Sequence, residues 1–308
     1  AVSEYDIDIF LVGLKEEIEK HLKENSKKSK LHIVEAKQVI GNDEMPVSAI
    51  KRKKDSSMVI GLKLVKDKVC DAFLSAGNTG AFLAGSLLRV GRIKGIDRPA
   101  LAPIIPSTKG NFMLIDAGAN VDCKPNNILQ FALMGSIYME KVEGVSTPKV
   151  GLLNNGLEES KGNELTRESY KLLKNSGLNF IGNVEARDII YGICDVCVCD
   201  GFVGNIVLKN TEGMASSLMS MIKEEVNKST ISKAGALLMK NSFVRLKKRF
   251  DYKEYGGAPF LGIDGIMIKA HGSSDRLAIK NAIRQGKLLF DNKCIDLIKN
   301  NISKTGVV

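Results

Sequence analysis

Short apolar segments alternate with segments of helical spacing along most of this 308-residue chain. The apolar segments cover residues 7–12, 31–36, 71–75, 112–116, 150–153, 194–199 and 265–270. The helical segments cover residues 16–25, 58–65, 81–88, 127–139, 164–175, 204–221 and 275–290. Nearly continuous apolar strands that alternate with helices are typical of a parallel sheet with helices on both faces. The pattern therefore predicts an α/β fold with a doubly wound, mostly parallel sheet.

Length and composition narrow the class of protein further. A chain of this length forms one large domain or two smaller ones, and we expect a single domain over residues 1–308. The hydrophobic content of 44% excludes a disordered chain. The longest uncharged stretch, residues 72–88, is too short and too polar to span a bilayer. The first residues do not resemble a signal peptide, so we expect a cytoplasmic protein.

Three of the six cysteines, Cys194, Cys197 and Cys199, lie close together in the sequence. A zinc or redox site needs further ligands at fixed spacing, but the chain has no second CxxC motif and only three His. The segment is typical of a buried strand in which Cys serves as a small apolar residue. We therefore expect no metal site, and the free thiols indicate a reducing cytosol.

A basic segment interrupts the alternation of strands and helices. Residues 226–250 contain no acidic residue but seven of the basic ones, in a chain whose net charge is +10. The same segment carries the apolar run 236–239, followed by Phe243, Val244 and Leu246. This pattern predicts an amphipathic helical excursion over residues 226–252. It can bind anionic lipid, recognise an acidic protein or form a dimer interface, and the sequence leaves these alternatives open.

Four strand-to-helix junctions are rich in Gly, Asn and Ser, and such junctions lie together at the ligand-binding edge of a doubly wound sheet. The first junction consists of Ser75, Ala76, Gly77, Asn78, Thr79 and Gly80. Its glycines allow close approach of the backbone, and the following helix offers unpaired N–H groups to an anion such as phosphate. It matches neither a dinucleotide-binding loop nor a Walker A loop. A tight turn with Thr79 as the helix cap is the structural alternative.

The second junction closes a strand with Asp116 and Asn120. These side chains either orient a ligand or cap a turn. The third junction contains Asp200, Gly204, Asn205 and Lys209.

A polar loop upstream of the third junction contributes Asn154, Lys161 and Asn163. Clustered Asn and Lys without a matching Ser–His pair indicate binding of an oxyanion rather than a protease triad. Taken singly, Lys161 and Lys209 are more typical of solvated surface lysines.

The fourth junction contains His271, Ser273 and Ser274. His271 is expected at the sheet edge, where an imidazole can act as acid, base or hydrogen-bond donor near neutral pH. One of the two serines is expected to cap the following helix. A histidine at a strand end is equally consistent with a structural role.

Seven segments in order resemble the phosphate acyltransferases of bacterial phospholipid synthesis, the PlsX type. They are SAGNTGA (75–81), DAGANVDC (116–123), LLNNGLEESKGN (152–163), NFIGNVEARD (179–188), DGFVGN with LK (200–209), YGGAPFLG (255–262) and AHGSS (270–274). The resemblance covers residues 6–299 and implies an enzyme with an isocitrate/isopropylmalate dehydrogenase-like fold. The family's usual opening strand, with a DxMGGD-like motif, is expected to be missing from this sequence, which begins inside the first expected helix.

The resemblance also implies a reaction and its partners. Acyl-[acyl carrier protein] and inorganic phosphate give acyl phosphate and free carrier protein, without a cofactor. A homodimer and peripheral contact with an anionic membrane are implied as well.

The residues suggest roles within that reaction. We expect Lys161, Asn205, Lys209 and His271 to be catalytic, by neutralising the phosphate or oxyanion or by donating a proton. The expected substrate- and phosphate-binding residues are Ser75, Gly77, Asn78, Thr79, Gly80, Asp116, Asn120, Asn154, Asn163, Asp200, Gly204 and Ser273.

Three other functions remain open from the sequence. A CoA-dependent phosphotransacetylase has a block similar to residues 200–209 and is distinguished by its acyl donor. A nicotinamide-dependent dehydrogenase shares the expected fold, but the chain lacks a dinucleotide-binding motif and an acidic metal cluster. A basic binding module is compatible with the net charge, but the positive charge is local and aromatic residues are sparse, so we expect no nucleic-acid partner.

Overall fold

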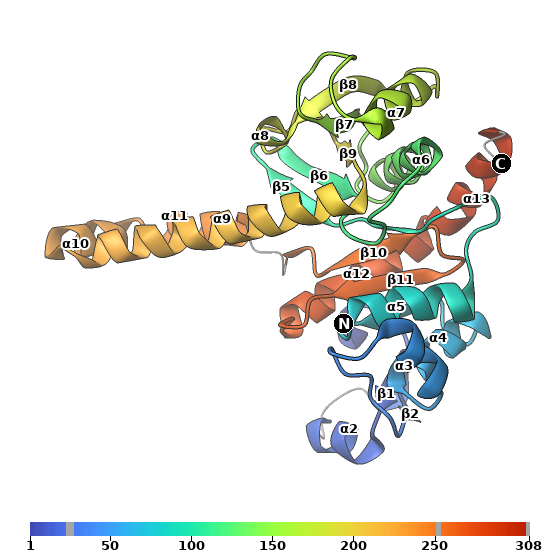
Figure 1. The fold of residues 1–308 in the computed structure, drawn as a ribbon. Coiled ribbons are helices and arrows are strands. Elements are labelled where there is room, and N and C mark those ends of the chain that lie inside the picture. The colour runs from blue at the N-terminus through green and yellow to red at the C-terminus, as the bar shows by residue number, and fades with distance from the viewer. Residues whose placement is uncertain (23–27, 251–253, 306–308) are drawn as a thin grey trace.

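The computed structural model describes residues 1–22, 28–250 and 254–305. Within these residues the strands form a two-stranded, a four-stranded and a five-stranded sheet. Figure 1 shows the five-stranded sheet with its helices in the upper half of the molecule and the four-stranded sheet with its helices below it. A long helical arm projects from between them.

The five-stranded sheet has the order β5 (Ile104–Ser107), β6 (Gly110–Ile115), β9 (Val196–Val198), β7 (Val150–Asn154) and β8 (Phe180–Glu185). All neighbouring strands are parallel except β5, which runs antiparallel to β6 at the sheet edge. Helices α6 (Pro125–Lys141) and α7 (Glu164–Lys174) pack against this sheet. Short helix α8 (Ala186–Ile189) follows β8, and apolar residues from the start of α9 (Gly201–Asn227) join the core around β6 and β9.

The four-stranded sheet has the order β3 (Ala72–Ser75), β11 (Ile266–Ala270), β10 (Gly257–Leu261) and β4 (Ala100–Leu101). Only β3 and β11 are parallel. Successive residues of β11 enter different cores: Ile266 and Ile268 pack in one cluster and Met267 in another. Both faces of this strand are therefore covered, which explains the apolar run 266–268 that precedes Lys269. Helices α12 (Arg276–Asp291) and α4 (Ser57–Lys66) contact the sheet.

The remaining elements complete the two halves. The two-stranded sheet pairs β1 (Ile9–Gly13) with β2 (Leu31–Glu35) in parallel. The other elements are α1 (Val2–Tyr5), α2 (Lys15–His21), η1 (Lys28–Lys30), α3 (Pro46–Arg52), α5 (Thr79–Gly85), the π-helical turn η2 (Ser86–Val90) and α13 (Cys294–Thr305).

The arm consists of α9, α10 (Thr230–Leu238) and α11 (Lys240–Phe250), and Figure 1 shows α10 and α11 returning along α9. The expected excursion over residues 226–252 thus begins at the end of α9, and residues 251 and 252 lie outside the described residues. Among the described helices, none is both long enough and apolar enough to cross a membrane.

The predicted α/β class with parallel strands is confirmed, but the strands do not form one doubly wound sheet. Strands β4, β5 and β10 pair antiparallel with their neighbours and were not anticipated, because they are short and adjoin or contain Pro or Gly. Helix α9 begins at Gly201 instead of residue 204, because the Asp200 carboxylate caps it by accepting hydrogen bonds from Phe202 N and Val203 N. Predicted helix 16–25 ends at His21 as α2, and residues 23–25 lie outside the described part of the chain.

Candidate active site

A cleft of about 1000 Å³ lies between residues of the five-stranded and the four-stranded sheets. Its lining includes Thr79, Asn205, Lys209 and His271, which the sequence places at three different strand-to-helix junctions. The fold therefore brings these four expected site residues to one cavity. Its volume is in the range of small-molecule binding sites.

Lys209, Lys269 and Arg187 supply positive charge to the cleft, and Glu212 adds one carboxylate. Lys269 is half-buried in β11, where it is the register partner of Ser75 in β3. Burial lowers the pKa of Lys269, and the charge of Lys209 lowers it further. The Lys269 ammonium donates hydrogen bonds to the backbone carbonyls of Ala270 and Ala76, while exposed Lys209 pairs with Glu212 at 3.0 Å. Three cations in one cleft, of which Lys269 is partly desolvated, suit an anionic ligand.

His271 follows β11 directly and is held by Ser273. The Ser273 backbone N–H donates to His271 Nδ1 at 3.2 Å, and the Ser273 hydroxyl lies 2.7 Å from the same nitrogen. Because Nδ1 accepts from the backbone, the proton of the neutral ring belongs on Nε2. Neither Ser273 nor Ser274 caps the next helix as expected: Asp275 does so, by accepting hydrogen bonds from Leu277 N and Ala278 N. Ser273 is therefore a support for the imidazole.

Asp116 and Asn120 form a buried turn at the end of β6. The Asp116 carboxylate is fully buried and accepts hydrogen bonds from Leu101 N, Gly118 N, Ala119 N, Asn120 N and Asn120 Nδ2. Burial raises the Asp116 pKa, and these hydrogen bonds oppose the rise. Neither Asp116 nor Asn120 lines the cleft. Of the two roles expected for these residues, the structure shows the one in the turn. Gly118, within this turn, does line the cleft beside Asn205.

Gly204 sets how closely α9 approaches this turn. A Cβ atom at Gly204 would lie 1.8 Å from the backbone oxygen of Asp116, so a larger residue does not fit. Gly204 is buried and was expected to contact substrate. Its position instead fixes the start of α9, and thereby Asn205, against the end of β6.

The first junction is a structured turn from which only Thr79 lines the cleft. The helix cap is Asn78 rather than Thr79, because Asn78 Oδ1 accepts a hydrogen bond from Ala81 N at 2.9 Å. Asn78 Nδ2 donates to the Asn42 carbonyl at 2.8 Å, and Ser75 Oγ accepts from Gly77 N at 3.2 Å. Gly80 packs close to the Pro46 ring. These polar groups hold the turn that presents Thr79.

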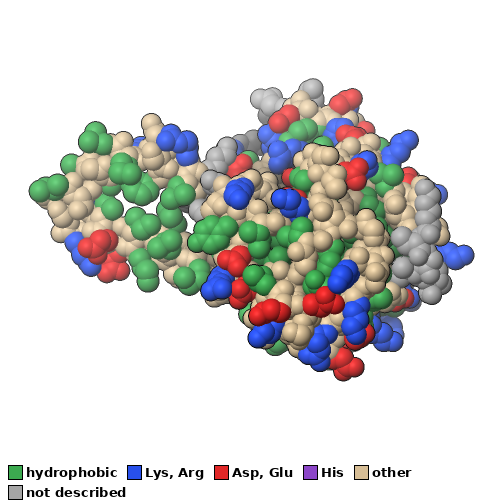
Figure 2. Space-filling view, turned by 90° about the horizontal axis from the view of Figure 1, so that it is seen from above, with side chains coloured by type: hydrophobic (Ala, Val, Ile, Leu, Met, Phe, Trp, Pro, Cys, Tyr) green, Lys and Arg blue, Asp and Glu red, His purple; other side chains and the backbone are tan. Residues whose placement is uncertain are grey.

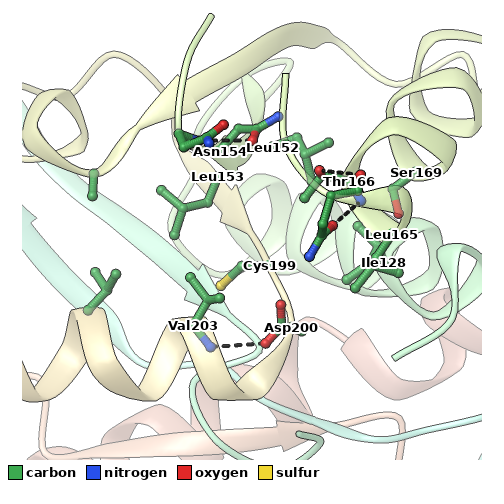
Figure 3. A pocket seen from close by; sticks show the side chains of 15 residues that line it. Ile128, Leu152, Leu153, Asn154, Leu165, Thr166, Ser169, Cys199, Asp200 and Val203 are labelled. Carbon is green, nitrogen blue, oxygen red and sulfur yellow. Dashed lines mark hydrogen bonds between the residues drawn. The ribbon is translucent and has the colours of Figure 1, made fainter. Parts of the chain in front are cut away.

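Three other expected site residues line a separate pocket. Asn154, Asn163 and Asp200 surround a hollow of about 370 Å³ between the end of β7, the start of α7 and the start of α9. Figure 3 shows Asn154 and Asp200 at opposite borders of this pocket. Lys161 is exposed in the neighbouring loop and lines neither hollow.

Cys194, Cys197 and Cys199 are buried around β9. Burial raises the pKa of the Cys199 thiol, and a hydrogen bond with Cys194 together with burial raises that of Cys197. Over residues 1–22, 28–250 and 254–305, no three His, Cys, Asp or Glu side chains are grouped to hold a metal ion.

Sequence reasoning missed Lys269 and the apolar walls of the cleft. Lys269 is the one charged residue in the otherwise apolar segment 265–270, and it directly precedes the AHGSS motif. A charge at the end of a buried strand was the available signal. The walls include Leu101, Pro103, Ile105 and Leu208. They come from β4, the residues around β5 and α9, so no local pattern could have joined them.

The chain matches the family model described as "Fatty acid synthesis protein" over residues 1–297. A phosphate acyltransferase of Alkaliphilus oremlandii is 55% identical over 307 residues, which cover 99% of this chain and 92% of that protein. A phosphate acyltransferase of Clostridium botulinum is 56% identical over 304 residues, with 98% and 91% coverage.

Solved structures of phosphotransacetylases share the fold. The enzyme from Streptococcus pyogenes aligns with a TM-score of 0.59 at 16% identity, over 92% of this chain and 85% of that one. The enzyme from Staphylococcus aureus aligns with a TM-score of 0.55 at 12% identity, with 92% and 94% coverage. The match to the family model and the identity to its members over nearly the whole length show that this chain belongs to the fatty acid synthesis protein (PlsX) family and is an acyltransferase.

Proposed function

We propose that the chain transfers an acyl group from acyl-[acyl carrier protein] to inorganic phosphate in bacterial phospholipid synthesis. The products are acyl phosphate and free carrier protein. Membership in the family and the shared name of its relatives, phosphate acyltransferase, support the reaction. The observation that carries it is the presence of Lys209 and Lys269 in a cleft with largely apolar walls. Such a cleft suits a phosphate and an acyl group together.

In the proposed reaction, a phosphate oxygen forms a bond to the thioester carbon and the C–S bond then breaks. Phosphate is ionised near neutral pH, and a thiol pKa of about 8.5 makes the thiolate a good leaving group. The protein therefore needs no activated Ser or Cys nucleophile. It has to hold the two reactants together and stabilise the tetrahedral oxyanion.

The proposed roles follow from the placement of the side chains. Lys209 and Lys269 bind phosphate, the Asn205 amide donates to the oxyanion, and His271 Nε2–H donates to the departing sulfur. Thr79 contributes a hydroxyl at the same cavity.

Other expected site residues hold in place the segments that line the cleft. Ser75, Gly77, Asn78 and Gly80 shape the turn before α5, while Asp116, Asn120 and Gly204 hold the start of α9. The catalytic role expected for Lys161 stays a prediction, as does the isocitrate/isopropylmalate dehydrogenase-like form of the fold.

The apolar walls are suited to the acyl chain. The lining continues along α9 from Lys209 to Ile222, a rise of about 20 Å at about 1.5 Å per residue. One lipid chain spans about 15 Å of a bilayer core that is about 30 Å thick. A long acyl chain therefore fits this length. Each methylene buried there contributes about 0.8 kcal/mol, so donor affinity is expected to rise about fourfold per carbon until the wall ends.

The arm is proposed to serve assembly and membrane contact. Met214, Leu218 and Met221 are exposed along α9 at spacings of four and three, which places them on one helix face. These three side chains also belong to the cleft lining, so a second copy of the chain that covers the stripe would give a homodimer and close the outer side of the proposed acyl site.

At the α10–α11 turn, Leu237 and Leu238 are 71% and 89% exposed, and Figure 2 shows hydrophobic side chains gathered on the projecting arm. Together with the Lys and Arg residues of segment 226–250, Leu237 and Leu238 suit peripheral contact of a cytoplasmic enzyme with anionic lipid. The same basic residues can attract an acidic carrier protein.

A CoA-dependent phosphotransacetylase-like activity is the second candidate, favoured by the shared fold. Phosphate-dependent thiol release from palmitoyl-[acyl carrier protein], palmitoyl-CoA and acetyl-CoA separates the two. Preference for the carrier protein supports the proposed function, whereas release from acetyl-CoA alone supports the alternative. No release from any donor contradicts both.

A further inference from the structure

The pocket of about 370 Å³ adjoins the cleft. Ala186 and Val207 line both hollows, and Val207 lies two residues before Lys209 in α9. Figure 3 shows β7 residues on one side of the pocket, α7 residues on a second side and the start of α9 on a third. An extended ligand in this pocket therefore ends beside the proposed phosphate site.

The charge of the pocket differs from that of the cleft. Its lining contains no Lys, Arg or His, and its one ionisable acidic side chain is Asp200. Both capping hydrogen bonds of Asp200 use Oδ1, and no described residue donates to Oδ2. A carboxylate without a cation disfavours phosphate, but it can accept a hydrogen bond from a neutral N–H group.

The polar lining otherwise consists of amides and hydroxyls, placed among Leu, Ile and Val side chains. Asn154, Asn163 and Thr166 border the pocket. Ser169 in α7 is fully buried, and its Oγ has no hydrogen-bond partner among the described residues. Buried hydroxyls in folded proteins almost always have a partner, and Ser169 is among the residues that line this pocket.

We propose that this pocket binds the neutral, amide-bearing arm that carries the acyl group on its terminal thiol, a pantetheine-type chain. This inference rests on the proposed function, because it assigns the donor's arm to one pocket and leaves the cleft to phosphate and the acyl chain. The amides of such an arm match Asn154, Asn163, Ser169 and Asp200 Oδ2, and its methylenes match the apolar lining. An acyl chain in this pocket would leave the Ser169 hydroxyl unpaired, and the larger cleft has more apolar wall for it.

A donor series tests the assignment. Phosphate-dependent thiol release is measured with S-ethyl octanethioate, which has no arm, and with octanoyl-pantetheine, octanoyl-CoA and octanoyl-[acyl carrier protein]. The acyl group is constant, so differences report the thiol side. We expect kcat/KM to be at least about tenfold higher for octanoyl-pantetheine than for the ethyl thioester, because each added hydrogen bond contributes about two- to tenfold.

Ser169→Ala locates the effect in the pocket. The substitution removes a hydroxyl that has no protein partner, so the fold should keep its stability. We expect a two- to tenfold higher KM for the three donors that carry an arm and no change for the ethyl thioester. Ser176→Ala is the matched control, because Ser176 lies just after the same helix, outside the pocket, and donates to Leu173 O.

The carrier-protein and CoA donors identify the source of the arm. Equal effects of Ser169→Ala on both support a site for the arm itself, and any remaining preference between them reports contacts beyond the pocket. Equal rates for armed and armless donors, with no effect of Ser169→Ala, overturn the inference while leaving the proposed function intact.

Saturation-transfer NMR with pantetheine alone gives a readout that does not depend on turnover. Signals that weaken in Ser169→Ala, but not in Ser176→Ala, support the site. Their absence in the wild-type protein contradicts it. No release from any donor would contradict the proposed function, and the NMR result would still decide the pocket.

Discussion

Lys269 lies in the same cleft as Lys209, and the charge of Lys209 adds to the effect of burial in lowering the Lys269 pKa. Lys209 is exposed and paired with Glu212, whereas Lys269 donates to the backbone carbonyls of Ala76 and Ala270. Lys269 is thus a partly desolvated cation without a carboxylate partner in those contacts. An incoming phosphate would compensate its charge.

Replacement of Lys269 by Met is expected to raise the KM for phosphate by about 10- to 100-fold. A hydrogen bond to a charged group contributes about 1.5–3 kcal/mol, and about 1.4 kcal/mol corresponds to tenfold. Lys269→Arg keeps the charge and should retain most of the affinity. Steady-state kinetics at varied phosphate measure this, and an unchanged KM in Lys269→Met would remove Lys269 from the phosphate site.

The lowered pKa of Lys269 also predicts a pH dependence. Lys269 loses its proton at a lower pH than an ordinary lysine, so phosphate affinity should fall as the pH rises through that lowered value. In Lys269→Arg the guanidinium stays charged, and the fall should move to higher pH. The measurement is the KM for phosphate against pH for both proteins. Identical profiles would show that another group controls the dependence.

Asn205→Ala and Lys209→Ala should each lower turnover by roughly 10²-fold if these side chains stabilise the transition state. Both are exposed on α9 within the cleft, so the fold should tolerate either change. Lys223→Ala, on the exposed surface of the same helix and outside the cleft lining, is the control. Normal turnover in both correctly folded variants would exclude them from catalysis.

Gly204→Ala should destabilise the protein, because the new Cβ would lie 1.8 Å from Asp116 O. Overpacking of this kind costs about 1–3 kcal/mol and should also displace Asn205. Gly213→Ala offers a comparison within α9, since a Cβ there meets no atom within 4 Å. It should stabilise the helix by about 0.5–1 kcal/mol. Denaturant unfolding measures both, and equal stabilities would contradict the close approach.

Replacing Leu237 and Leu238 together by Asp should abolish flotation with anionic liposomes. Both side chains are exposed at the end of α10, so the change removes apolar contact without disturbing a core. Thiol release without membranes should stay close to normal. Val69→Asp is the control, because Val69 is also exposed but lies outside the arm. Undiminished flotation of the double variant would defeat the lipid-binding role.

Local sequence signals located most elements for a physical reason. The apolar run at residues 150–153 became β7, and the polar-apolar repeat at residues 164–175 became α7, because burial follows local periodicity. Strands β5 and β10 were missed because each contains a proline, which usually argues against a strand. Their pairing with β6 and β11 is decided by tertiary contacts.

The sequence predicted which strand-to-helix junctions contribute to the candidate site, but not that their residues are divided between two hollows. The sequence identified the junctions that contain Thr79, Asn205, Lys209 and His271, because Gly, Asn and Ser after apolar strands mark ligand-binding edges. It did not separate them from Asn154, Asn163 and Asp200, which line a different pocket. For Asp116 it left two roles open, in ligand binding or in a turn, and in the structure both carboxylate oxygens accept hydrogen bonds within the turn.

By itself, the sequence determined the α/β class, the family and the junction residues, since these depend on local periodicity and on motifs read in order. Tertiary structure alone decided that the strands divide into three sheets, that Lys269 faces the same cleft as Lys209, and that Ser169 is buried without a partner. Burial and long-range electrostatics depend on residues far apart in the chain. Ser75 and Lys269, for example, meet only because β3 pairs with β11.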